Sequence, residues 1–157
     1  MNILTLLHNL RDAIADDINI KTWSQTNYTR DHKVYVGIDD RKPPPVSEYP
    51  IVHLFPINKI SGYELAAQDH GIGATCGIHN EGTTNTGKTN AFELTGIIHI
   101  EEFRKLVETA IINAAVWPVR VEALNIEYET VEFFPFFLAT MEFKLAHDYC
   151  QGEDVFE

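Results

Sequence analysis

Two hydrophobic patterns meet in residues 91–115, AFELTGIIHIEEFRKLVETAIINAA. Residues 91–100 are dense in apolar side chains and predict a strand. From residue 101 onward the apolar side chains recur at helical spacing, and two glutamates stand at the N-terminal end, where the helix dipole favours acidic groups. The sequence therefore predicts a strand that runs directly into an amphipathic helix over residues 101–115.

On the N-terminal side of this junction, the chain begins with another helical pattern. Apolar residues between positions 3 and 18 recur at helical spacing, which predicts one helix of about four or five turns. Asp16 and Asp17 fall near its C-terminal end, where they oppose the helix dipole unless another interaction needs them. Strands are expected at residues 33–38, 50–57 and 71–78.

On the C-terminal side, two further strands are expected. In residues 124–130 apolar and acidic side chains alternate, as in a half-buried strand. The same alternation marks a closing strand that begins near Phe133 and runs to Leu145. The order of helix, strands, helix and strands contains no repeated βαβ unit. It favours an α+β fold, a mostly antiparallel sheet with an N-terminal helix and a second amphipathic helix packed on one face, in a single domain over 1–157.

Acidic residues dominate the charge of the chain. Twelve Lys and Arg stand against 23 Asp and Glu, which gives a net charge of −11 at pH 7. Such a chain repels phosphate backbones, so we expect no specific nucleic-acid binding. No run of about 18 apolar residues predicts a membrane span, and two cysteines do not make a disulfide framework. We expect a soluble protein that is made in a reducing cytoplasm.

Residues 82–89, GTTNTGKT, match the P-loop pattern G-x-x-x-x-G-K-[ST] at every position. This pattern holds phosphates where it leads from a buried strand into the N-terminus of a helix. Here the following residues are typical of a strand, and no later apolar strand ends in an aspartate that could hold magnesium. We therefore interpret residues 80–90 as a mobile polar loop. A small nucleotide-binding enzyme that uses Lys88 and Thr89 is the less favoured alternative.

Three residues with metal-ligating side chains, His70, Cys76 and His79, lie close together in sequence. A structural zinc ion takes four ligands, usually in short paired spacings, and Cys150 is the only other thiol. No serine stands in a G-x-S-x-G nucleophile elbow. The sequence therefore predicts no metal, no cofactor and no catalytic residue, and we expect the protein not to be an enzyme.

Two segments are better explained by contacts with other proteins. Residues 39–49 contain three consecutive prolines, which cannot lie inside a sheet, and predict an extended, exposed arm. Residues 133–137, FFPFF, place aromatic side chains on both faces of a strand, and their proline favours an edge strand or a bulge. Both faces could be internal; otherwise one face is an exposed patch that marks an interface. The candidate interface residues are Arg41, Lys42, Pro44, Phe134, Phe136 and, in the loop, Lys88.

The order of these segments resembles the tail-terminator family of long-tailed bacteriophages. The resemblance lies in four stretches that together cover most of the chain: LLHNLRDAI, VYVGIDDRKPPPVSEYPIVHL, FELTGIIHIEEFRKLVETAI and FFPFFLATMEFKL. The chain departs from the family pattern in residues 58–90, which look like an insertion, and in the acidic tail 152–157.

The resemblance implies a structural protein of the virion, in the neck region of the tail. The family forms a homo-oligomeric ring, a hexamer, that caps the tail tube at its full length and then presents a surface to the head-completion proteins. We therefore expect a tail-tube protein, a head-completion or connector protein and further copies of this chain as partners, with DNA passing through the lumen. A ring needs heterologous contacts, for which arm 39–49 and segment 133–137 are plausible halves. Another neck, connector or tail-tube subunit is the alternative.

Overall fold

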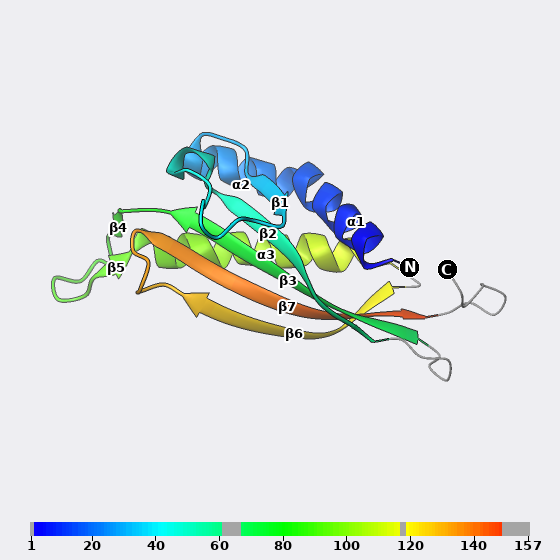
Figure 1. Cartoon of the computed structure of the whole chain (residues 1–157). Coiled ribbons are helices and arrows are strands. Elements are labelled where there is room, and N and C mark those ends of the chain that lie inside the picture. The colour runs from blue at the N-terminus through cyan, green and yellow to red at the C-terminus, as the bar shows by residue number, and fades with distance from the viewer. Residues whose placement is uncertain (1, 61–66, 117–118, 149–157) are drawn as a thin grey trace.

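The computed structural model describes residues 2–60, 67–116 and 119–148 of the chain (Figure 1). The predicted acidic tail 152–157 and Cys150 lie outside the described residues. The helices are α1 (Ile3–Asp16), α2 (Ile18–Tyr28) and α3 (Thr95–Ala114), with a 3-10 turn at Val46–Glu48. The strands are β1 (Lys33–Val36), β2 (Ile51–Ile60), β3 (Ala67–His79), β4 (Thr83–Thr84), β5 (Glu93–Leu94), β6 (Val119–Glu129) and β7 (Phe136–Asp148).

Five strands form one sheet in the order β1-β2-β3-β7-β6. The pairs β2–β3, β3–β7 and β6–β7 are antiparallel, and only the short β1 runs parallel to its neighbour β2. The predicted α+β fold with a mostly antiparallel sheet is therefore confirmed. Strands β4 and β5 form a separate two-stranded hairpin beside the start of α3.

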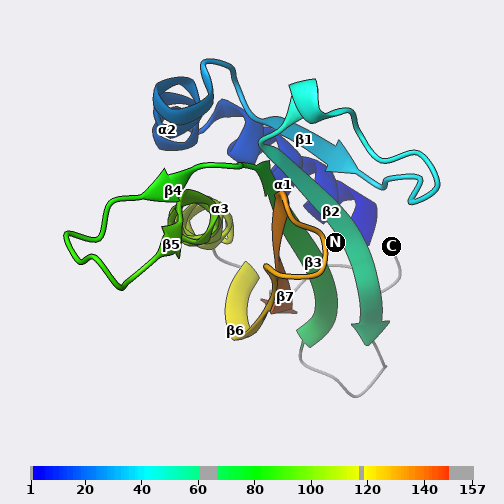
Figure 2. The same cartoon turned by 90° about the vertical axis from the view of Figure 1, so that its left-hand side faces the viewer.

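Alternation along the strands separates a covered face of the sheet from an uncovered one. The inward side chains of β7 are all buried: Phe137, Ala139, Met141, Phe143 and Leu145. They join one core with the buried residues of α1 and α3, so both helices pack on the same face (Figure 2). The outward side chains of β7, such as Glu142 and Lys144, point away from the helices and are exposed. The predicted single-sided packing and the alternation of the closing strand are both confirmed.

The predicted single N-terminal helix is in fact two helices. Helix α1 ends at Asp16, and Asp17 is the N-cap of α2. One carboxylate oxygen of Asp17 accepts hydrogen bonds from the backbone N–H groups of Asn19 and Ile20, both at 2.9 Å. An aspartate is among the best residues at this position, because it satisfies N–H groups that have no partner within the helix. The unfavourable position of Asp17 at the end of α1 is therefore explained by its role as the N-cap of α2.

The predicted strand over residues 91–100 is wrong. Only Glu93 and Leu94 are in a strand, and α3 begins at Thr95 and runs for 20 residues. Gly96 explains part of the difference: a Cβ at this position would lie 2.2 Å from the ring of Phe137. The first turn of α3 therefore approaches the sheet closely, and residues 95–100 of the apolar stretch are the start of this helix rather than part of a strand. Periodicity over a short apolar run does not separate these two cases.

Residues 133–137 also differ from the prediction. Residues 131–135 form a turn, β7 begins at Phe136, and β7 lies between β3 and β6 in the interior of the sheet. Pro135 therefore stands just before the strand, where its missing N–H interrupts no sheet hydrogen bond. The predicted edge strand or bulge is not present at this segment.

Candidate interaction surface

An apolar groove lies on the outer face of the sheet, at the end where β7 begins. Its volume is about 420 Å³. One wall is formed by the predicted arm, through Asp40, Pro43 and Pro44. The other wall is formed by Phe133 in the turn before β7 and by Phe136 at the start of β7. The floor consists of outward side chains of three neighbouring strands, among them Ile51, His53, Thr75 and Leu138. We refer to this feature as the groove.

The arm is exposed as predicted, but its C-terminal part is held by the body of the protein. Arg30 Nη1 donates a hydrogen bond to the backbone oxygen of Ser47 at 2.6 Å. Glu48 forms an ion pair with Lys33 at 3.2 Å and accepts a hydrogen bond from the hydroxyl of Tyr35. These contacts lower the pKa of Glu48, first through Tyr35 and then through Lys33, and burial together with this carboxylate raises the pKa of Tyr35 to about 12. The arm is thus fixed beside β1 rather than extended freely into solvent.

The two basic residues of the arm do not face the groove. Arg41 is exposed and pairs with Asp39 within its own turn, at 2.9 Å from Nε to Oδ1. Lys42 lies beside the prolines on the side of the arm that faces Tyr35 and Glu48. Pro44 touches both sides, because it lines the groove as well. Of the predicted arm residues, Pro44 is therefore the one in the groove, with Asp40 as the charged side chain next to it.

Phe134 and Phe136, on either side of Pro135, have different surroundings. The ring of Phe136 lines the groove and packs against the rings of Tyr49 and His79, with centroids 5.1 and 5.0 Å apart. The ring of Phe134 instead meets Phe137 edge-on at 6.1 Å, and half of Phe134 is exposed. Phe136 is therefore a groove residue, whereas Phe134 is a surface residue beside the core.

The groove is almost uncharged. His53 forms part of its floor, and burial lowers the pKa of this imidazole, although the nearby Asp40 acts in the opposite direction. At neutral pH His53 is therefore uncharged. Its Nε2 atom is buried and has no hydrogen-bond partner among the described residues. The groove thus offers mainly apolar and aromatic contacts, and Asp40 places one carboxylate at its rim.

Lys88 lies on the β4–β5 hairpin, on the other side of the molecule from the arm (Figure 2). The predicted loop 80–90 is therefore partly a hairpin, since Thr83 and Thr84 pair with Leu94 and Glu93. A helix does follow, contrary to the prediction, but it begins six residues after Thr89.

The N-terminus of α3 is occupied by the chain itself. The N–H of Thr95 donates to the backbone oxygen of Gly82 at 3.0 Å, and the hydroxyls of Thr84 and Thr95 are 3.0 Å apart. A phosphate-binding P-loop places its lysine and threonine at the first turn of the helix. Here residues 82–84 lie at that turn, and Lys88 stands at the tip of the hairpin.

The three residues considered for zinc are separated by the geometry of β3. His70 and Cys76 point into the core, six residues apart, which is about 20 Å along a strand. His79 points to the outer face, where it packs on Phe136. Within residues 2–60, 67–116 and 119–148, no three His, Cys, Asp or Glu side chains gather as a metal site would require.

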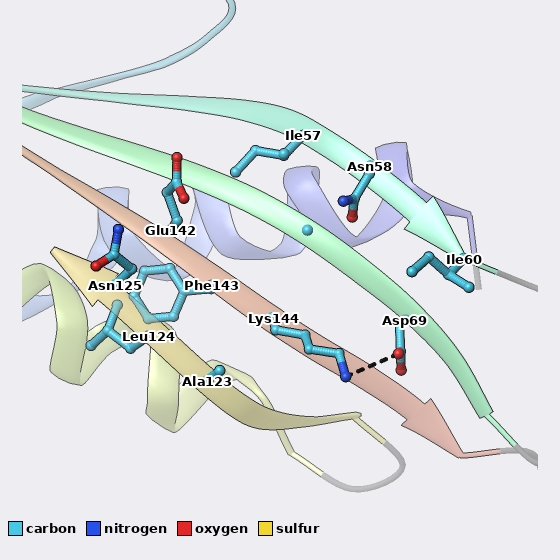
Figure 3. Close-up of a pocket in the computed structure, with 11 residues that line it drawn as sticks. Ile57, Asn58, Ile60, Asp69, Ala123, Leu124, Asn125, Glu142, Phe143 and Lys144 are labelled. Atoms are coloured by element: carbon cyan, nitrogen blue, oxygen red, sulfur yellow. Dashed lines mark ion pairs between the residues drawn. The ribbon is translucent and has the colours of Figure 1, made fainter. Parts of the chain in front are cut away.

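A second hollow of about 320 Å³ lies on the outer face nearer the other end of the sheet (Figure 3). Ile57 and Ile60 on β2 form its apolar rim. Lys144 crosses the hollow and pairs with Asp69 at 3.1 Å and Glu122 at 2.8 Å, which raises the pKa of the ammonium group. Both acidic partners belong to neighbouring strands, so these ion pairs tie β3, β7 and β6 together.

Several groove residues carry no signal in the sequence. Ile51, His53, Thr75 and Leu138 come from three strands that are distant in the chain, and the sheet register brings them together. The sequence could have indicated only that these side chains point to the outer face of the sheet, because they alternate with buried ones along each strand. The structure also places the arm and the turn on one groove. They therefore belong to one surface of a single copy and are not the two complementary halves of a contact between neighbouring copies, as the sequence had suggested.

No protein-family model matches the chain, and a search of curated proteins gives no match either. Among the described residues, no helix has the length and apolar character needed to cross a membrane.

Proposed function

We propose that the protein is a structural subunit of a long-tailed phage, a tail terminator that assembles into a homo-oligomeric ring and acts without turnover. The observation that carries the proposal is the groove together with the apolar side chains around its end of the molecule. Phe133, Phe134 and Val131 expose 50%, 51% and 85% of their surfaces there. Exposed apolar side chains that cluster beside a groove mark protein interfaces.

The segments that resemble the family also support the proposal. They correspond to α1, to β1 with the arm and β2, to β5 with α3, and to the turn with β7. Together these elements contribute most of the core and both walls of the groove. Strand β3, the centre of the sheet, lies within the stretch that departs from the family pattern, and β6 lies outside the four segments.

In this role the ring caps the tail tube, meets the head-completion proteins on its other side and lets DNA pass through its lumen. A net charge of −11 on every copy gives such a lumen a strongly negative potential, which keeps DNA from adhering. The hexameric number follows from the family resemblance.

Electron microscopy of the purified protein tests the proposal directly. Negative-stain images and light scattering are expected to show closed rings, alone or after addition of the tail-tube protein encoded in the same genome. Rings should bind one end of polymerised tubes and stop their growth. Monomers only, both with and without tubes, would contradict the ring. Immunogold labelling along the whole tube, or only at the head vertex, would instead identify a tube or connector subunit.

The nucleotide-binding alternative has one observation in its favour: residues 82–89 lie between strand β3 and helix α3, as a P-loop lies between a strand and a helix. If these residues bind phosphates, millimolar ATP or GTP raises the melting temperature, and Lys88→Ala abolishes the rise. We expect no nucleotide-dependent shift in either protein, because Lys88 is held away from the first turn of α3.

A further inference from the structure

The β4–β5 hairpin projects from the body of the molecule (Figures 1 and 2). Its connecting residues 85–92 end in Phe92, which exposes 92% of its surface. No other large apolar side chain in the described part of the chain is exposed to this degree. A phenylalanine in this position has no packing role within its own subunit.

The hairpin and the groove lie at the same end of the molecule but point to opposite sides. In Figure 2, which views this end, the hairpin extends to one side and the arm that walls the groove extends to the other. The hairpin that carries Phe92 therefore points away from the groove of its own copy. Two neighbouring copies placed side by side bring the hairpin of one towards the groove of the next.

Lys88 on the hairpin and Asp40 at the rim of the groove carry opposite charges. Lys88 is the only charged residue in the connecting residues 85–92. Asp40 is the only charged residue that lines the groove, and the exposed Glu132 stands next to Phe133 on the far wall. Asp39 is occupied by Arg41, whereas Asp40 forms no ion pair within the described residues.

The composition of the groove also suits an aromatic side chain. Its lining includes the rings of Pro43, Pro44 and Phe136 around a volume of about 420 Å³, and a phenylalanine that packs tightly against other side chains buries about 150–250 Å² of its surface. An aromatic anchor in an apolar pocket with polar groups at its rim is the usual arrangement of an interface hot spot.

We propose that Phe92 of one copy binds in the groove of a second copy, with Lys88 lying against Asp40 at the rim. Because the contact joins two different surfaces, it is heterologous and can repeat around a closed ring. The inference rests on the proposed function, since it identifies the contact between neighbouring subunits of that ring.

The first test compares Phe92→Ser with a matched control, Val116→Ser. Val116 is also strongly exposed, at 67%, but it lies beyond the opposite end of α3. Sedimentation velocity should show that Phe92→Ser weakens self-association at least about tenfold, as expected for loss of an aromatic hot spot, and that Val116→Ser leaves it unchanged. Both side chains are on the surface, so circular dichroism should show native folding in both variants.

The second test is a disulfide cross-link between the hairpin and the groove. Phe92→Cys and Pro43→Cys are combined in one chain in which Cys150 is replaced by serine; the remaining Cys76 is fully buried. Oxidation should give a ladder of covalent oligomers that ends at the size of the ring. Neither single-cysteine variant should form species larger than dimers.

The outcomes separate this inference from the proposed function. Rings that form equally well with Phe92→Ser, or a double-cysteine protein that stops at dimers, would overturn the hairpin contact but leave the ring. Loss of tail-tube binding by Phe92→Ser with self-association intact would assign the hairpin to the tube instead and overturn the contact between copies. A wild-type protein that stays monomeric under all conditions, with tubes present, would refute both.

Discussion

Burial decides the protonation of His70, which points inward from β3. Its side chain is fully buried, and neither ring nitrogen has a hydrogen-bond partner among the described residues. Burial is the main reason that the pKa falls from 6.5 to about 4, and the positive charge of Lys59 acts in the same direction. His70 is therefore a neutral member of the core at neutral pH, and protonation would place a charge in a buried site where the nearby Asp69 offsets only part of the cost.

This environment predicts a loss of stability in mild acid. In the unfolded chain His70 binds a proton near pH 6.5, whereas in the folded chain it does so only near pH 4. Between these values the unfolded state binds more protons, so the free energy of unfolding falls as the pH falls. Urea denaturation from pH 7 to pH 4.5 should show that His70→Leu removes a slope of up to about 1.4 kcal/mol per pH unit. Equal slopes in both proteins would contradict the assignment.

Asp17 shows how one side chain can set the boundary between two helices. We expect Asp17→Ala to lower the free energy of unfolding by about 0.5–2 kcal/mol, because the N–H groups of Asn19 and Ile20 lose their acceptor. The adjacent Asp16→Ala is the matched control, since Asp16 makes only an exposed ion pair with Lys21 at 3.6 Å and should cost less than about 0.5 kcal/mol. Chemical denaturation measures both. Equal losses would mean that the cap does not stabilise α2.

At the level of secondary-structure elements, the close approach of α3 to the sheet depends on Gly96. Replacement by alanine favours a helix by up to about 1 kcal/mol in isolation, yet the new Cβ would lie 2.2 Å from the ring of Phe137. We expect Gly96→Ala to destabilise the protein by about 1–3 kcal/mol, as overpacking does. In a Phe137→Leu background the same change should cost less, and a double-mutant cycle measures the coupling. If the two substitutions have additive effects on the free energy of unfolding, the new methyl group does not clash with Phe137, because α3 shifts away from the sheet at no cost.

The elements differ in how far the sequence could predict them. Strand β7 was predictable because its apolar residues Met141, Phe143 and Leu145 alternate with polar ones, and one face of the sheet is buried. Helix α2 was not, because it buries only Ile20 and Ser24 and its remaining side chains are mostly polar, so no apolar face stands out. Its start signal, Asp17, could be recognised only once a helix was expected after it.

The candidate site was predictable in its parts but not in its arrangement. The prolines of the arm and the aromatic residues near Phe136 stand out in the sequence. Their proximity depends on two pairings between distant segments: β1 with β2 in parallel, and His79 on β3 opposite Phe136 on β7. Such non-local register has no local signal in one sequence. The β4–β5 hairpin was missed for a different reason, because two-residue strands are too short to show a period.

For the molecule as a whole, the net charge and the apolar contact act against each other in assembly. Each copy carries a net charge of −11, so neighbouring copies in a ring repel one another. The proposed contact between Phe92 and the groove has to exceed this repulsion, and the ion pair between Lys88 and Asp40 adds little, since exposed pairs contribute only about 0–1 kcal/mol. Ionic strength therefore separates the two contributions.

Self-association should strengthen as salt rises. Between 0.1 M and 1 M NaCl the Debye length falls from about 10 Å to about 3 Å, which screens the repulsion between copies and leaves the burial of Phe92 intact. Sedimentation velocity across this range should show a rising association constant. Lys88→Glu should associate more weakly at 0.1 M and respond more steeply to salt, because it loses the one attractive pair and makes each copy more acidic. An association that weakens with salt in the wild-type protein would mean that ion pairs, rather than the apolar groove, hold the copies together.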